Sequence, residues 1–319
     1  MIETEIQTDK MLGRAPSPQS PWRDAWRRLR RNPVAMASLF ILGVFLLIGI
    51  LAPWTAPYSY TDQNLSLVEQ PMSGAHWFGT DSLGRDLLSR VMWGFRTSFL
   101  VATVVVGIST ILGVFFGAIA GYFGRWVDTA VMRFGDFLFA FPGLLLAILL
   151  AATLQPKVVE WTRQWEGLIG MPGLSRTGVV DYLVVFIALS TLGWAGLARL
   201  IRGQVLTIKE KAFVEAARAI GASPRRIILR HILPNTIGVL LVAVSMGMGG
   251  AILGEATLSF IGIGIKPPNP SLGIILSEEL GKWRTHQHLF FIPGGITALL
   301  IFAFNFLGDG INDAFNPRT

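Results

Sequence analysis

The chain lacks cysteine altogether and has few charged residues for its length of 319. The absence of cysteine excludes disulfides, thiolate metal sites and a cysteine nucleophile. Asp, Glu, Lys and Arg together make up 15% of the residues, against about a quarter in a typical soluble domain. Hydrophobic residues make up 52%. Water is therefore not the main solvent of this protein.

Six long apolar runs are present, at 34–52, 99–120, 137–154, 182–198, 237–265 and 289–307. Each has at least roughly the 17 residues that an α-helix needs to cross about 30 Å of hydrocarbon at about 1.5 Å per residue. The first run is longer than a secretory signal core, which has about 7 to 15 apolar residues, and no A-x-A site follows it. We therefore predict an all-α integral membrane protein with six transmembrane helices, the first of them retained.

The positive charges are distributed unevenly among the connections between these runs. Most of the 27 Lys and Arg residues lie in the N-terminal arm, in the second and fourth connections and at the C-terminal end. Because cytoplasmic loops carry the excess of positive charge, this pattern places both termini in the cytoplasm. The net charge of +7 is accordingly interpreted as membrane topology, and not as a surface for nucleic acid.

We divide the chain into a cytoplasmic N-terminal arm, residues 1–33, and a six-helix transmembrane domain, residues 34–319. Within the arm, Trp22, Trp26 and Leu29 recur at i, i+4 and i+7 among arginines. This pattern is typical of a basic amphipathic helix on the inner leaflet of a membrane. An equally good interpretation is that the arginines are ordinary charges flanking the first span.

The connection between the fourth and fifth spans, residues 209–235, carries a clear local pattern. It has an apolar helix face, a glycine suited to the left-handed conformation, an N-cap, a first-turn proline, and a second proline that ends or kinks the next helix. The residues are Phe213, Ala216, Ala217 and Ile220, then Gly221, Ser223, Pro224 and Pro234. We expect a rigid, cationic helix-turn-helix, here called the elbow. Its apolar face suits either a groove on a soluble partner or the membrane surface.

The elbow resembles a known motif. It is similar to the E-A-A loop of permease subunits of binding-protein-dependent ABC importers. The similarity lies in Glu215-Ala216-Ala217, in Gly221 six residues after Glu215, and in the Ile-Leu-Pro sequence that ends at Pro234. The stretches 78–86, 258–268 and 305–310 look like the dipeptide, oligopeptide and nickel permease family, and the loop after the first span suits its second permease type. Leu272, where the family often has tryptophan, and the long connection 155–181 depart from the family pattern.

The resemblance implies a function. The chain would be a permease subunit that translocates di- or oligopeptides, or alternatively nickel or another small solute, across the inner membrane. ATP and Mg would be bound by one or two partner ATPase subunits and not by this chain. The other implied partners are a second homologous permease, a periplasmic or lipoprotein solute-binding protein and the bilayer. The ATPase-coupling residues would be Glu215, Ala216, Ala217, Gly221 and Pro234.

Other classes of function leave few traces. No G-x-x-x-x-G-K-[ST] is present, so the chain has no Walker loop of its own. An ion-gradient transporter would need ionisable groups deep within its spans, where Glu255 is the main candidate. Glu255 either lines the translocation path or, as we favour, bonds a neighbouring helix. Asp136 is expected to pair with Arg133 at i, i+3.

Two outward connections carry weaker signals. His286 and His288 are a poor metal site at i, i+2, and we predict no bound metal. The charges of the Asp81 to Asp86 stretch either contact a docked binding protein or form an internal clasp around a turn at Gly84, orienting a short helix over 87–95. We favour the clasp.

Small residues also recur at helical spacing within the spans. Gly113, Gly117 and Gly121 form two small-xxx-small steps, and Gly250 with Gly254 forms another. Such steps let helix backbones approach each other closely, so we favour a packing role for all five positions. The alternative for the five glycines between Gly247 and Gly262 is bending of the fifth helix during gating.

Overall fold

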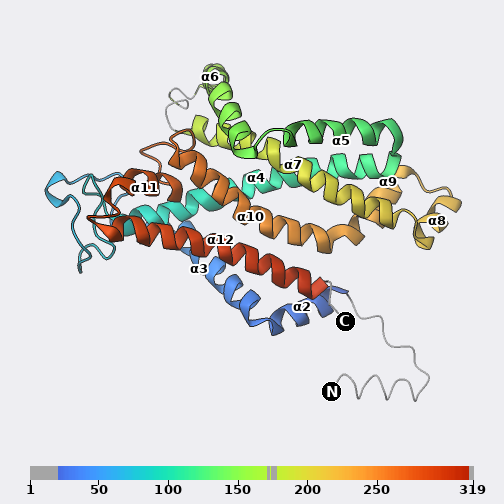
Figure 1. The fold of residues 1–319 in the computed structure, drawn as a ribbon, viewed down its shortest axis with the longest axis horizontal. Coiled ribbons are helices and arrows are strands. Elements are labelled where there is room, and N and C mark those ends of the chain that lie inside the picture. Colours follow the sequence, from blue (N-terminus) through green and yellow to red (C-terminus); the bar gives the residue numbers. More distant parts are fainter. Residues whose placement is uncertain (1–20, 171–172, 174–177, 316–319) are drawn as a thin grey trace, which may run out of the picture.

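The computed structural model describes residues 21–170, 173 and 178–315, and its helices run mostly along one long axis (Figure 1). Within those residues, six helices are long and apolar enough to cross a membrane, as predicted from the six runs. They are α3 (Pro33–Thr55), α4 (Leu87–Phe123), α6 (Gly143–Ile169), α7 (Val179–Ile208), α10 (Ile237–Phe260) and α12 (Gln287–Phe315).

The second span corrects one expectation. The predicted short helix over 87–95 is not separate, because α4 runs without a break from Leu87 to Phe123. Asp86 is its N-cap, and its side chain accepts a hydrogen bond from the Ser89 amide. The first turns of this helix include Arg90 and Arg96, so the uninterrupted apolar run begins only at residue 99.

The third apolar run is divided between two helices. Phe137 belongs to α5 (Arg125–Phe139), and α6 begins only at Gly143. Between them, Pro142 disfavours the helical conformation at Phe141, so the helix is interrupted there. At its other end α6 continues past residue 154 to Ile169, which makes much of the predicted connection 155–181 helical.

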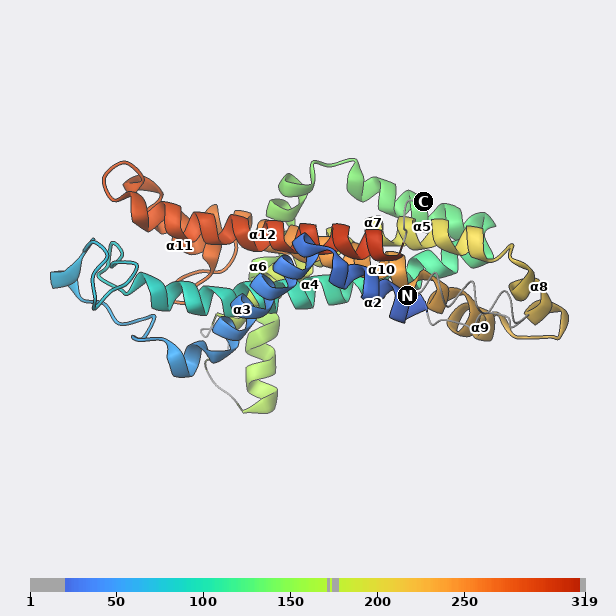
Figure 2. The ribbon, with the colours of Figure 1, turned by 90° about the horizontal axis from the view of Figure 1, so that it is seen from below.

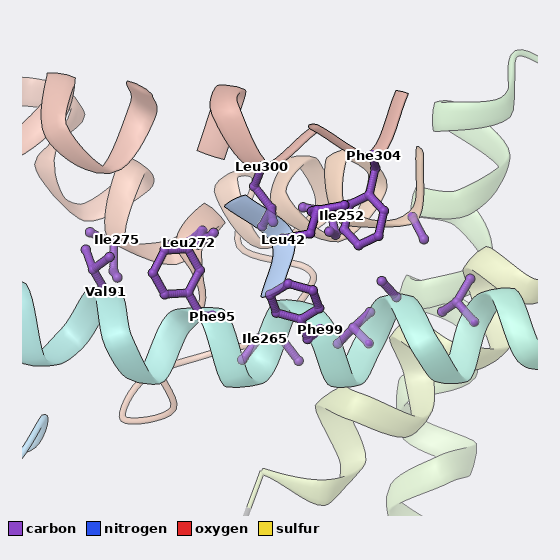
Figure 3. Close-up of a cluster of buried hydrophobic side chains, with 14 of the residues drawn as sticks. Leu42, Val91, Phe95, Phe99, Ile252, Ile265, Leu272, Ile275, Leu300 and Phe304 are labelled. Carbon is purple, nitrogen blue, oxygen red and sulfur yellow. The ribbon is translucent and has the colours of Figure 1, made fainter. Parts of the chain in front are cut away.

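The main apolar core lies along one face of α4 (Figure 3). Phe95 and Phe99 of α4 point toward α3, α10 and α12, and Phe99 meets Phe304 edge to face with ring centroids 5.9 Å apart. Leu272 of α11 (Leu272–Glu279) is fully buried in the same cluster. Leu272, which stands where the family often has tryptophan, is therefore a residue of the apolar core.

The glycines of α4 confirm the packing prediction at one interface. A Cβ atom added at Gly113 would lie 2.5 Å from the Leu197 Cβ atom, and one added at Gly121 would lie 2.8 Å from the Val205 Cβ atom. Backbone contact between α4 and α7 therefore requires glycine. Gly250 is different, because an added Cβ would meet nothing within 4 Å among the described residues. The packing prediction is wrong there within this chain.

The elbow and the longest loop lie at opposite ends of the molecule (Figures 1 and 2). The elbow contains α8 (Ala212–Ala219), α9 (Pro224–Ile227), a π-helical turn (Ile228–Ile232) and a 3₁₀ turn (Leu233–Thr236). The loop over 56–86 and helix α11 occupy the other end. The structure thus separates two candidate functional regions along the axis of the spans.

The basic amphipathic helix of the arm is confirmed as α2 (Pro21–Arg31). It packs on the end of α12, where the Trp22 and Phe315 rings meet at 5.3 Å and the Arg28 Nη1 atom donates to the Ala314 carbonyl at 3.4 Å. One face of the helix is therefore occupied by protein. Trp22 and Trp26 remain 49% and 44% exposed.

Candidate functional site

The elbow turn forms as its sequence predicts. Gly221 has φ +80°, in the left-handed region that favours glycine. The Ala222 amide donates to the Ala217 carbonyl and the Gly221 amide to the Arg218 carbonyl, both at 3.0 Å, which is the Schellman pattern at a helix C-terminus. Ser223 then caps α9 by accepting from the Arg226 amide at 3.4 Å. The left-handed Gly221, the two backbone hydrogen bonds and the Ser223 cap therefore fix the angle between α8 and α9.

One side of the elbow is packed into the protein. Val214 is fully buried and Ala217 is 5% exposed. Together with Ile227 and Ile232 they form a cluster with residues of two spans, namely Ala118 of α4 and Ile201, Val205 and Ile208 of α7. In addition, the Lys209 Nζ atom donates to the Gly121 carbonyl at 3.0 Å. The elbow is thus attached to the ends of α4 and α7 by apolar contact and a hydrogen bond.

This packing divides the apolar face predicted from the sequence. Phe213 and Ile220 are 41% and 86% exposed, whereas Ala217 points into the cluster beside Val214. The sequence pattern predicted a single apolar face and did not indicate Val214, because an eight-residue helix with apolar residues on most sides has no single obvious face. Ala217 belongs mainly to the attachment, and Ala216 to the exposed side.

The exposed side of the elbow holds a shallow pocket of about 460 Å³, the elbow pocket. Phe213, Ala216 and Ile220 form an apolar part, and Arg226, Arg230 and His231 form a basic part. Glu215 is exposed on the neighbouring surface of α8. An apolar surface bordered by exposed positive charge is suited to contact with another protein.

Pro234 lies in an irregular helical segment that joins α9 to α10. It lies in the 3₁₀ turn, which is preceded by the π-helical turn and followed directly by α10. Proline has no amide hydrogen, so the normal helical ladder is interrupted. The Asn235 Nδ2 atom donates to the His231 carbonyl at 2.7 Å and the Thr236 hydroxyl to the Leu233 carbonyl at 2.8 Å. These side chains compensate for the interruption and keep the elbow continuous with the fifth span.

Glu255 lies within α10 and is fully buried between helices. Its carboxylate accepts hydrogen bonds from the Ser259 hydroxyl at 2.7 Å and from the Ser98 hydroxyl of α4 at 3.4 Å. It is absent from the lining of the neighbouring cavity of about 340 Å³ between α4, α7 and α10, which includes Ser109 and Gly250. These contacts support the packing interpretation, and contact with a transported solute stays a prediction.

At the other end of the molecule, the clasp is confirmed and is larger than expected. The Asp81 Oδ2 atom accepts from the Arg85 Nε and Arg90 Nη1 atoms, both at 2.6 Å. Glu278 of α11 binds the same two arginines, at 2.8 and 2.6 Å. Glu279 also accepts from the Ser82 hydroxyl at 2.6 Å. We use the name clasp for Asp81, Arg85, Arg90 and Glu278, which join the loop over 56–86 to α11.

The two histidines of the last connection lie beside the same loop. The His286 Nδ1 atom is 3.3 Å from the Glu69 Oε2 atom, and Glu69 also pairs with Lys282. The described residues contain no group of three or more histidine, aspartate or glutamate side chains placed to hold a metal ion.

The ion pair predicted within α5 is wrong. The Asp136 Oδ1 atom pairs with the Arg199 Nη2 atom of α7 at 2.8 Å. A second aspartate of α5, Asp128, pairs with Arg202 of the same helix α7. Tertiary packing of α5 on α7 thus supplies partners that the local i, i+3 spacing did not indicate.

Comparison with known proteins identifies the family. Residues 113–319 match the family of binding-protein-dependent transport system inner membrane components, and residues 20–71 match the N-terminal transmembrane domain of oligopeptide transport permease C. The chain is 39% identical over 302 residues to the oligopeptide transport system permease protein OppC of Haemophilus influenzae, covering 94% of this chain and 89% of that protein.

Two other relatives cover similar lengths. The dipeptide transport system permease protein DppC of Bacillus subtilis is 38% identical over 297 residues, covering 93% of this chain and 85% of that protein. The glutathione transport system permease protein GsiD of Escherichia coli O6:K15:H31 is 38% identical over 303 residues, covering 94% of this chain and 91% of that protein. With six candidate spans and these similarities along nearly its whole length, the chain belongs to the multi-pass inner-membrane permeases of binding-protein-dependent transport systems, a family of non-catalytic subunits.

Proposed function

We propose that this permease takes up short peptides and that the elbow couples its spans to a partner ATPase. The relatives described above are named for transport of oligopeptides, dipeptides and glutathione, which are all short peptides. That common chemistry supports a peptide cargo. The cargo would be delivered by a solute-binding protein, and a second, homologous permease would complete the path through the membrane.

The observation that carries the coupling role is the attachment of the elbow to two spans. A force applied to α8 acts on α4 and α7 through Val214, Ala217 and the Lys209 hydrogen bond. It also acts on α10, because the 3₁₀ turn containing Pro234 leads directly into that helix. Since closely packed interiors deform little, a displacement of the elbow moves these helix ends with it.

The proposed topology follows from this role and from the distribution of positive charge. Both termini and the elbow, residues 209–235, lie in the cytoplasm, where ATPase subunits are found. Residues 1–33 form the cytoplasmic arm, within which helix α2 lies along the inner leaflet, and residues 34–319 form the permease domain. The clasp and α11 then lie on the outer side, where a binding protein would release its solute.

In the proposed cycle, ATP binding closes two ATPase subunits and displaces the elbow with them. The helices attached to it tilt, which opens the path to the outer side by alternating access. Glu215 and Ala216 contact the ATPase, Ala217 anchors α8 to the spans, Gly221 fixes the angle between α8 and α9, and Pro234 marks the deformable link to α10. ATP and Mg²⁺ act on the ATPase subunits, and hydrolysis returns the elbow to its first position.

Substitution of Gly221 tests the coupling. At φ +80° a β-branched residue is strained, whereas asparagine adopts this conformation more readily. We expect Gly221→Val to insert normally but to reduce ATP-driven peptide uptake by about tenfold or more, while the matched Gly221→Asn variant retains most of it. Uptake of a labelled dipeptide by the reconstituted complex, with ATP hydrolysis measured in parallel, gives both quantities. Wild-type uptake by a normally assembled Gly221→Val complex would contradict the proposed coupling role of the elbow.

The same preparation tests the alternatives. Mass spectrometry of the complex purified from its native membrane should show a second permease and Walker-type ATPases. Competition of uptake by nickel but not by peptides would assign a different cargo within the family. Uptake by the purified single chain that responds to ionophores and ignores ATP would favour an ion-gradient transporter.

A further inference from the structure

The elbow pocket has a chemical polarity that the coupling role alone does not require. Its apolar part is formed by Phe213, Ala216 and Ile220 of α8 and the following turn. Its basic part is formed by Arg226 and Arg230, which are both exposed. Arg230 follows Arg226 by four positions, so the two lie about one helical turn apart and project on the same side of the elbow.

The two arginines have no carboxylate partner among the described residues. Only four described arginines, Arg85, Arg90, Arg199 and Arg202, pair with an aspartate or glutamate, and the other exposed arginines of the elbow, Arg218 and Arg225, have no such pair either. The elbow is also basic as a whole, because Lys and Arg outnumber Asp and Glu between residues 209 and 235. Unpaired guanidinium groups beside an exposed isoleucine leave both charge and apolar area to be covered.

Building on the proposed coupling function, we propose that the elbow pocket binds an acidic segment of the partner ATPase, in which a carboxylate is held between Arg226 and Arg230. An apolar side chain of the same segment covers Ile220 and Phe213. Guanidinium groups bind carboxylates with short, charge-assisted hydrogen bonds and can do so in a bidentate manner, which gives the contact a fixed geometry.

The arrangement also gives the elbow a means of selecting its ATPase. The shape of α8 and its turn depends on glycine and an N-cap, which many sequences can supply. The charges at 226 and 230 are an independent property of the pocket wall. An ATPase whose corresponding segment is basic or uncharged would leave these arginines desolvated and unpaired, which disfavours the wrong partner.

Charge reversal tests this inference on the complete transporter complex. We expect Arg226→Glu with Arg230→Glu to weaken binding of the isolated ATPase to the permease complex in nanodiscs by about tenfold or more, and to flatten its salt dependence. The matched control is Arg218→Glu with Arg225→Glu. It makes the same change in charge at two exposed arginines of the elbow that do not line the pocket. Equal weakening by both pairs would overturn the inference, because the effect would then be general attraction.

A cross-link identifies the occupant. The chain has no natural cysteine, so Ile220→Cys provides a single attachment point for a maleimide photo-cross-linker on this subunit. A cross-linked ATPase peptide that contains aspartate or glutamate supports the inference, and a lipid adduct or a peptide without acidic residues overturns it. If the ATPase cross-links but charge reversal has no effect, coupling survives and the charge-recognition inference fails. If no ATPase binds the wild-type complex, the proposed coupling itself fails.

Discussion

Removal of Arg90 is the most direct test of the clasp at the end opposite the elbow. Arg90 is 1% exposed and donates to Asp81 and Glu278, in each case at 2.6 Å. Arg90→Met keeps much of the side-chain volume and removes the charge. The substitution therefore perturbs the attachment of the loop over 56–86 to α11 with little change in packing.

The loss of stability can be derived from the hydrogen bonds that Asp81 and Glu278 keep after the substitution. Loss of one partner of a buried ion pair commonly costs about 3–5 kcal/mol. Here Asp81 keeps the Arg85 Nε atom and two backbone amides, those of Leu83 and Arg85, within 2.9 Å. Glu278 is 21% exposed and keeps the Arg85 Nη2 atom. Since neither carboxylate is left without partners, we expect a smaller cost of about 2–3 kcal/mol, the upper range for hydrogen bonds to charged groups.

Hydrogen exchange measures this cost locally. A cost of about 2–3 kcal/mol corresponds to roughly 30- to 140-fold faster exchange of amides protected by the loop, at about 1.4 kcal/mol per tenfold. The amides of Asp81 and Leu87 report it, because they donate to the Arg85 and Gly79 carbonyls. Arg96→Met is the control, since Arg96 is exposed on the same helix and lies over the Trp93 ring. Exchange within about threefold of wild type in Arg90→Met would refute the view that the clasp holds this loop.

Two further substitutions test packing and pH dependence. Gly117→Val should prevent close contact of α4 with α7, where an added Cβ would lie 3.0 Å from the Ile201 Cβ atom, and size-exclusion chromatography should show much less folded protein than for Gly107→Val, where no atom lies within 4 Å. Equal yields of the two variants would contradict the packing argument. Burial raises the pKa of Glu279, and its hydrogen bonds from Ser82 only partly oppose this shift. The folded state therefore favours the protonated form, so stability should fall as pH rises from the ordinary glutamate pKa through the raised one. Glu279→Gln should flatten that part of the thermal stability profile; an unchanged slope would assign the dependence to another group.

The sequence predicted the elbow well because its determinants are local. Gly221, Ser223 and Pro224 act within one or two turns, and each has a single strongly preferred conformational role. The division of α8 into a buried and an exposed side was not predictable in the same way. It depends on α4 and α7, whose positions relative to the elbow are not encoded in the elbow sequence.

The clasp also contains contacts that the local sequence does not encode, here between residues far apart in the chain. The pairing of Asp81 with Arg85 followed from their spacing around Gly84. Glu278 and Glu279 lie almost two hundred residues further along the chain, and one sequence contains no signal that links them to Asp81. Two adjacent carboxylates at the end of an apolar helix were the only local indication. Glu278 neutralises the two buried arginines, whereas Glu279 accepts a hydrogen bond from Ser82.

Helix α4 connects the two regions, which bears directly on the proposed mechanism. Ala118 near its end is part of the cluster that holds the elbow, and Arg90 near its start is part of the clasp. At about 1.5 Å per residue, these positions lie roughly 40 Å apart on one continuous helix. A separate short helix over 87–95, as predicted from the sequence, would have let the two ends move separately. Because α4 is unbroken, the proposed displacement of the elbow would reach the clasp as motion of one rigid element, and α11 is joined to that element by the Glu278 ion pairs.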